Sequence, residues 1–111
     1  MNVKDLCEKM DMQIKGGEKG LNKEVKGVYS CDLLSWVMAH GKNKDAWVTI
    51  QTHSNTIAVA SLLEMSCIII PENAEIEEET IKRADDEEIP ILNSSLSSYE
   101  ICYRIHDIIK D

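Results

Sequence analysis

Residues 46–55 read AWVTIQTHSN. The apolar and β-branched run of this stretch stops abruptly in four polar residues, and the apolar segment 56–64 follows at once. Such a run followed by residues that favour loops and helix starts predicts a strand over 46–51, a loop over 52–55 and a helix over 56–64. The stretch is therefore a strand–loop–helix unit.

The same unit occurs four times from Val25 onward. The expected strands are 24–29, 46–51, 67–70 and 89–92, and the expected helices are 33–40, 56–64, 76–87 and 97–109. Alternating strands and helices predict an α/β fold with a small, mostly parallel sheet, right-handed crossovers and helices packed on the sheet. Segment 67–70 is apolar throughout, which is typical of a central parallel strand. Pro90 favours an edge position or a first-residue position for the last strand.

The N-terminal segment adds a short helix over 2–10, with Asn2 as its cap, and a short strand over 12–14. The glycine cluster over 16–20 does not have the spacing of a phosphate-binding loop, because no Gly-Lys-Ser/Thr follows it. We expect a glycine turn between two strands.

Helix 33–40 is apolar on most of its sides. Ser30 or Asp32 can cap its start, and Gly41 can end it. We expect this helix to be well buried, either in the fold or against a partner.

Composition limits the classes of function. A chain of 111 residues with 43% hydrophobic residues predicts one folded domain over 1–111. A net charge of -8 argues against nucleic acid and against anionic membrane surfaces as partners. The longest apolar run, 65–71, is too short to span a membrane.

The four cysteines, Cys7, Cys31, Cys67 and Cys102, form no pair with the spacing of a zinc site. Three of them lie in apolar contexts, so we expect buried free thiols. The sequence begins without a signal-peptide pattern, and we expect a cytoplasmic protein without cofactor or metal.

Ligands of open parallel sheets bind outside the carboxyl ends of the strands. The polar residues expected at those ends suit a small polar ligand or anion, held by hydroxyls, amides and helix N-terminal N–H groups. The candidate ligand-binding residues are Ser30, Asp32, Thr52, His53, Ser54, Asn55, Asn93, Ser94 and Ser95, with Glu72 and Asn73 at the same edge. The alternative is that these residues only cap helices.

His53 is the one residue in these loops that capping does not explain. It can act as an acid or base, bind a metal or donate to an anion. Ser54, His53 and Asp32 could form a hydrolytic triad on paper, but no Gly-x-Ser-x-Gly is present. The other histidines, His40 and His106, are dispersed and give no metal signature. We therefore expect no catalytic residues.

Three segments resemble a known family. They read WVTIQTHSNTIAVASLL, CIIIPENAEIEEETIKRADDEEIPILNSS and SSYEICYRI, and the upstream Val-Lys-Gly-Val at 25–28 fits the same layout. They resemble the DRTGG domain family, which is similar in fold to the N-terminal domain of HPr kinase/phosphorylase. The resemblance implies an accessory or regulatory module and not a kinase, because the phosphate-binding loop of that kinase lies in a separate domain and has no counterpart here.

The loop 52–55 departs from the family pattern. Members often carry an Asp-Arg pair at this point, and Thr52-His53-Ser54-Asn55 stand here instead. The departure removes the Arg that would most naturally hold a phosphate.

These observations favour a non-catalytic regulatory module that binds a small polar or phosphorylated ligand, or a partner, at the strand ends. The alternative is an oligomerisation or structural accessory protein, a homodimer or the partner of an enzyme. Small free-standing members of the family resemble proteins encoded beside iron hydrogenase components, which implies a redox or hydrogenase-type enzyme system for that alternative. A kinase or a hydrolase is the third hypothesis, supported only by His53 and by the family resemblance.

Overall fold

A five-stranded sheet lies at the centre of the computed structural model, which describes residues 1–110. The strand order is β1-β5-β4-β3-β2. The strands are β1 (Gln13–Gly16), β2 (Gly27–Ser30), β3 (Asp45–Val48), β4 (Cys67–Ile70) and β5 (Ile91–Asn93). Neighbours from β2 to β5 pair in parallel, and β1 pairs with β5 antiparallel. The predicted α/β fold with a mostly parallel sheet is confirmed.

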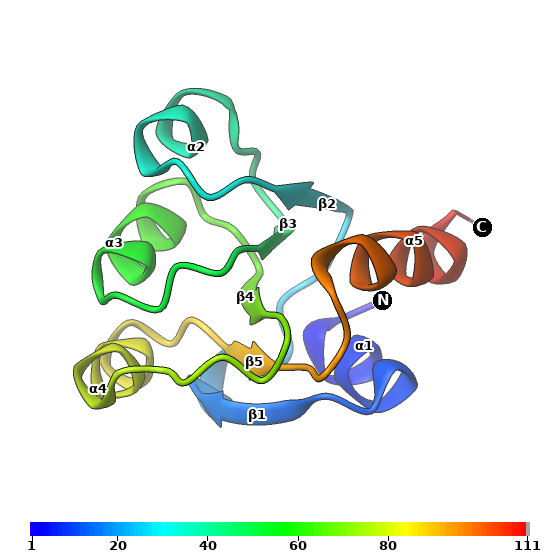
Figure 1. Ribbon diagram of the computed structural model, residues 1–111, viewed down its shortest axis with the longest axis horizontal. Helices are drawn as coiled ribbons and strands as arrows, with labels where there is room; N and C mark the ends of the chain where they lie inside the picture. The colour runs from blue at the N-terminus through cyan, green and yellow to red at the C-terminus, as the bar shows by residue number, and fades with distance from the viewer. Residues whose placement is uncertain (111) are drawn as a thin grey trace.

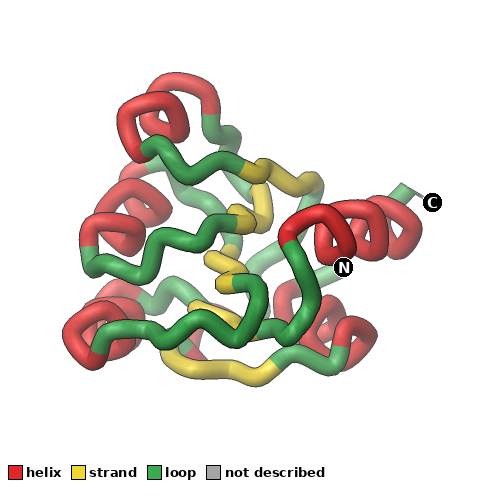
Figure 2. The backbone as a smooth tube through the Cα atoms, in the orientation of Figure 1, coloured by secondary structure: helices red, strands yellow, loops and turns green. Residues whose placement is uncertain are grey.

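Helices cover both faces of this sheet. Figure 1 shows α2, α3 and α4 on one face and α1 and α5 on the other, and Figure 2 shows the strands between the two groups. The helices are α1 (Val3–Met10), α2 (Leu34–His40), α3 (Asn55–Leu62), α4 (Glu78–Glu87) and α5 (Ser98–Ile109), with a 3₁₀ turn η1 (Glu18–Gly20). The chain therefore forms three layers.

β4 is the central strand, as its sequence predicts. Its four residues are 0% exposed. Cys67 and Ile69 pack into the core beneath α1 and α5, and Ile68 and Ile70 pack into the core beneath α2, α3 and α4. Alternating residues of one strand thus supply both hydrophobic layers.

Four of the five strands have other boundaries than the sequence predicts. β1 (expected over 12–14) and β5 (expected over 89–92) differ by one or two residues at each end, and β2 and β3 differ most. The strand expected over 46–51 ends at Val48, because the backbone N–H of Ile50 donates to Asp32 and leaves the sheet. The strand expected over 24–29 begins at Gly27, and Val25 instead donates its N–H to the carbonyl of Met1. Helix 76–87 begins two residues later than expected, at Glu78.

Of the two positions that Pro90 favours for the last strand, the structure rules out the edge and has the proline at the start of the strand. β5 lies between β4 and β1, because the antiparallel β1 adds on its outer side. Pro90 stands just before β5, where its missing N–H costs no ladder bond, and its carbonyl accepts the N–H of Ile68.

The glycine turn after β1 is confirmed, and Gly17 illustrates why glycine is required there. Gly17 has a φ of 72°, and a Cβ there would lie 2.0 Å from the carbonyl oxygen of Ile89. Its N–H donates to Asp85 Oδ1 at 2.7 Å, which connects the turn to α4. The short helix η1 follows directly.

α2 is not well buried in the single chain, contrary to expectation. Val37 is its one fully buried side chain among the described residues, whereas Leu33, at its start, and Trp36 are 62% and 54% exposed. The reason is its place at the end of the sheet, where it packs beside α3 and leaves its outer side uncovered.

All four cysteines are free thiols, and two of them are buried, one fewer than the sequence predicts. Cys7 and Cys67 are buried, and Cys31 and Cys102 are half-buried. No helix among residues 1–110 has both the length and the apolar character needed to cross a membrane.

The buried thiol of Cys67 predicts a pH dependence of stability. Burial raises the pKa of Cys67 to about 12, whereas an unfolded cysteine ionises near about 8.5. As the pH rises, the thiol therefore ionises in the unfolded state before it ionises in the folded state. The free energy of unfolding declines between about pH 8.5 and pH 12, by about 1.4 kcal/mol per pH unit. Urea unfolding at pH 8, 9 and 10 measures this decline.

Cys67→Ala should show a shallower decline than the parent chain, and Cys31→Ala, at the half-buried thiol, is the matched control. Equal slopes for the parent and Cys67→Ala would contradict the prediction.

Candidate functional site

The carboxyl ends of β2, β3, β4 and β5 meet at one edge of the sheet, which we call the carboxyl edge. All nine predicted site residues lie at this edge, in loops, at strand ends or, for Asn55, at the first residue of α3: Ser30, Asp32, Thr52, His53, Ser54, Asn55, Asn93, Ser94 and Ser95. The hydrogen bonds of this edge form three groups, and Ser30, the exposed last residue of β2, belongs to none of these three. The edge is therefore not one continuous pocket.

The first group surrounds Asp32. Asp32 Oδ1 accepts the hydroxyl of Thr49 at 2.8 Å and the N–H of Ile50 at 2.9 Å. The Gln51 side-chain amide donates to the Asp32 carbonyl at 3.1 Å. The prediction that Ser30 or Asp32 caps helix 33–40 is wrong: the N-cap is Leu33, and no side chain caps it. Asp32 instead connects the loop after β2 to the loop after β3.

The second group surrounds His53. Its Nδ1 accepts the N–H of Asn55 at 3.1 Å, so the neutral ring carries its proton on Nε2. The Thr56 hydroxyl donates to the carbonyl of His53 at 2.8 Å. His53 thus satisfies an N–H of the first turn of α3, and the expectation that capping cannot explain it is wrong. Ser54 is the N-cap residue but makes no side-chain cap bond.

Thr52 connects this loop to the neighbouring helix. Its carbonyl accepts the hydroxyl of Thr80, a buried residue of α4, at 2.6 Å. The loop between β3 and α3 is therefore held from both sides, by Asp32 and by Thr80.

The third group lies where β4 and β5 end. Asn93 and Ser94 are both 6% exposed. The N–H of Asn73 donates to the carbonyl of Ser94 at 2.8 Å, and the N–H of Glu72 donates to the carbonyl of Leu96 at 2.9 Å. Ser95 is exposed. These bonds hold the loops after β4 and β5 against each other.

The chain changes direction between these two strands. After β4 it continues into α4 on one face of the sheet, and after β5 it continues into α5 on the other face (Figure 1). Such a switch point opens a crevice in which open α/β sheets bind ligands. A cavity of about 360 Å³ lies beside it, lined by Gln13, Lys15, Asn73, Ala74, Glu75, Ile76, Ile81 and Asn93.

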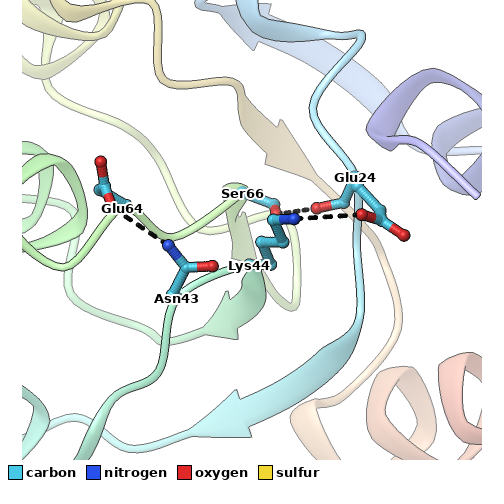
Figure 3. Close-up of polar contacts among 5 residues, drawn as sticks. All are labelled: Glu24, Asn43, Lys44, Glu64 and Ser66. Atoms are coloured by element: carbon cyan, nitrogen blue, oxygen red, sulfur yellow. Dashed lines mark hydrogen bonds and ion pairs between the residues drawn. The ribbon is translucent and has the colours of Figure 1, made fainter.

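A larger cavity, of about 590 Å³, lies at the opposite, amino edge of the sheet. Figure 3 shows the contacts that line it: Asn43 donates to Glu64 at 3.1 Å, Lys44 pairs with Glu24 at 3.3 Å, and the Ser66 hydroxyl donates to the carbonyl of Glu24. Sequence reasoning missed this cavity. Its walls come from several distant segments, and no single motif marks it.

The amino-edge cavity also holds a half-buried lysine. Lys23 Nζ donates to the carbonyl of Glu88 at 2.7 Å, and burial lowers the pKa of Lys23 from its ordinary value. Within residues 1–110, no three side chains of His, Cys, Asp or Glu gather closely enough to hold a metal.

Two comparisons with known proteins bear on this geometry. The family model of the DRTGG domain matches residues 5–108. The fold is similar to a crystal structure of the CBS and DRTGG domains of the regulatory region of Clostridium perfringens pyrophosphatase, complexed with the activator diadenosine tetraphosphate, at a TM-score of 0.68 and 12% identity. The match covers 90% of this chain and 44% of that one, so this chain spans less than half of the solved relative. No curated protein matches in sequence.

The contacts of Asp32 predict its contribution to stability. Asp32→Ala removes the acceptor of two hydrogen bonds and should lower the free energy of unfolding by about 1–2 kcal/mol, since bonds to a charged group exceed the ordinary value. Urea denaturation measures the loss.

Asp107→Ala is the control. Asp107 is exposed, and its one ion pair, with Lys110, is 3.5 Å long. Its change should stay within about 0.5 kcal/mol. A loss for Asp32→Ala no larger than for the control would show that Asp32 does not connect the two loops in solution.

Proposed function

The chain belongs to the DRTGG domain family, and on this premise we propose that it is a non-catalytic regulatory module that binds a small polar or phosphorylated ligand in the cavity beside the carboxyl ends of β4 and β5. The four free cysteines support a reducing, cytoplasmic setting for it. The observation that carries the proposal is the backbone of the loop after β4.

That loop contains two consecutive residues other than glycine in the left-handed region. Glu72 has a φ of 57° and Asn73 a φ of 51°. Asparagine tolerates this conformation, but glutamate adopts it at a cost of about 1 kcal/mol. Strained backbone that neighbouring bonds hold in place is typical of ligand sites. Here the carbonyls of Ser94 and Leu96 hold both residues.

The cavity beside the loop offers donors and acceptors together. Gln13, Asn73 and Asn93 provide amides, and Lys15 provides one ammonium group. Glu75 lines the same cavity, and its carboxylate disfavours a ligand with a high negative charge. The lining therefore supports a ligand with polar groups and few negative charges, such as a nucleoside monophosphate.

The other residues of the carboxyl edge discussed above do not line this cavity. Asp32 and Thr80 fix the loop between β3 and α3, and His53 and Ser54 begin α3. Because this loop lacks the Arg that would hold a phosphate, Lys15 is the cation that the proposal requires.

Thermal unfolding with added AMP and with diadenosine tetraphosphate, the activator in the solved relative, tests the proposal. AMP should raise the melting temperature of the parent chain. Lys15→Ala and Gln13→Ala, both at exposed positions, should weaken its binding about tenfold, which is about 1.4 kcal/mol.

Lys9→Ala, at an exposed position of α1 outside the cavity, is the matched control and should bind like the parent. A shift that survives in both cavity variants would place the ligand elsewhere. No shift with either nucleotide would contradict the nucleotide version of the proposal.

An oligomerisation or accessory module is the alternative, and the exposed apolar side chains of α2 favour it. Leu33, Trp36 and Met38 are 62%, 54% and 44% exposed. Sedimentation velocity at micromolar concentration measures whether they associate. A dimer that Trp36→Ala dissociates would support this alternative. A monomer at every concentration would exclude self-association of the chain through α2.

A further inference from the structure

β2 is an outer strand of the sheet and, within residues 1–110, pairs with β3 alone. The N–H of Lys26 donates to the carbonyl of Lys44 at 2.9 Å. Every second residue counted from Lys26 therefore directs its N–H and carbonyl toward β3. Because peptide groups of a strand alternate between its two neighbours, Gly27 and Tyr29 direct theirs away from the sheet. The outer side of β2 is thus a row of donors and acceptors that another strand could use.

A groove of about 470 Å³ runs along this strand. Tyr29 of β2, His40 at the end of α2 and the loop residue Lys42 contribute to its walls. The groove therefore continues from the open strand edge toward α2.

Asp45 contributes a carboxylate to the groove, with one oxygen bonded within the chain and the other accessible. The residue is 8% exposed, and its Oδ2 accepts the N–H of Lys42 at 3.3 Å. Its Oδ1 has no hydrogen-bond partner within residues 1–110 and lies 2.8 Å from the position that a Cβ on Gly27 would occupy. Glycine at 27 thus leaves Oδ1 open to a donor side chain on a strand added beyond β2.

The charges beside the groove select its occupant. Lys26 and Lys42 are exposed and belong to no ion pair within residues 1–110, although the chain carries a net charge of -8. Two copies of this chain paired through the edge would place four lysines next to one another, between two domains that each carry a net negative charge. The positive edge therefore favours an acidic partner over a second copy.

We propose that the outer edge of β2 binds an extended acidic segment of a partner protein as a sixth strand, with a hydroxyl or amide side chain placed beside Gly27 to donate to Asp45. Main-chain bonds to Gly27 and Tyr29 supply affinity, and Lys26 and Lys42 supply the preference for acidic residues. This surface is separate from the cavity beside the ends of β4 and β5.

A labelled peptide with alternating valines and threonines between two glutamates at each end is the probe. Fluorescence anisotropy at low salt should show saturable binding, and the same peptide with lysines in place of the glutamates should not bind. The double variant Lys26→Glu/Lys42→Glu should weaken binding at least tenfold. Lys9→Glu/Lys82→Glu, with the same change of charge at exposed sites of α1 and α4, should retain at least half of the affinity.

Amide exchange by NMR distinguishes strand addition from loose ionic attraction. The amides of Gly27 and Tyr29 should exchange more slowly in the complex. No binding of the acidic peptide, equal binding of the lysine peptide, or binding without protection of these two amides would overturn the proposal. A dimer that Lys26→Glu/Lys42→Glu dissociates would also overturn it, since the edge would then serve a second copy.

Discussion

The burial of β4 is the constraint on which the rest of the structure depends. A parallel strand with both faces apolar must be covered on both sides, and Cys67 to Ile70 are 0% exposed. Burying one such aliphatic side chain contributes about 1.5–3 kcal/mol. β3 and β5 cover its edges, and two helical layers cover its faces (Figure 1).

Covering both faces fixes where the chain must cross the sheet. α2, α3 and α4 follow strands in one direction and cover one face, so α1 and α5 must supply the other. The crossing happens after β5, so the chain leaves β4 toward one face of the sheet and β5 toward the other. The cavity beside these two strand ends is thus a consequence of packing, and the left-handed Glu72 and Asn73 are the local cost of turning the chain there.

The sequence predicts what depends on local pattern. The apolar run 67–70 and the four strand–loop–helix units predict the central strand and the parallel sheet. It does not predict what depends on distant partners. β3 is shortened because Asp32 competes for the N–H of Ile50, and α2 is exposed because it packs beside α3 at the end of the sheet. The sequence does not predict the capping role of His53, because no sequence rule anticipates an imidazole that accepts an N–H at the start of a helix.

Volume alone would place the ligand site in the amino-edge cavity, but electrostatics favour the smaller cavity beside the ends of β4 and β5. The C-terminal ends of α3 and α4 lie at the amino edge, where helix dipoles add negative potential to Glu64 and Glu87. Asn43 and Lys44 are already paired with carboxylates there. At the carboxyl edge, Lys15 makes no ion pair within residues 1–110, and the amides of Gln13 and Asn73 face the same space. A polar ligand therefore displaces fewer existing hydrogen bonds and ion pairs in the smaller cavity than in the larger one. Available donor groups, more than cavity volume, distinguish the two.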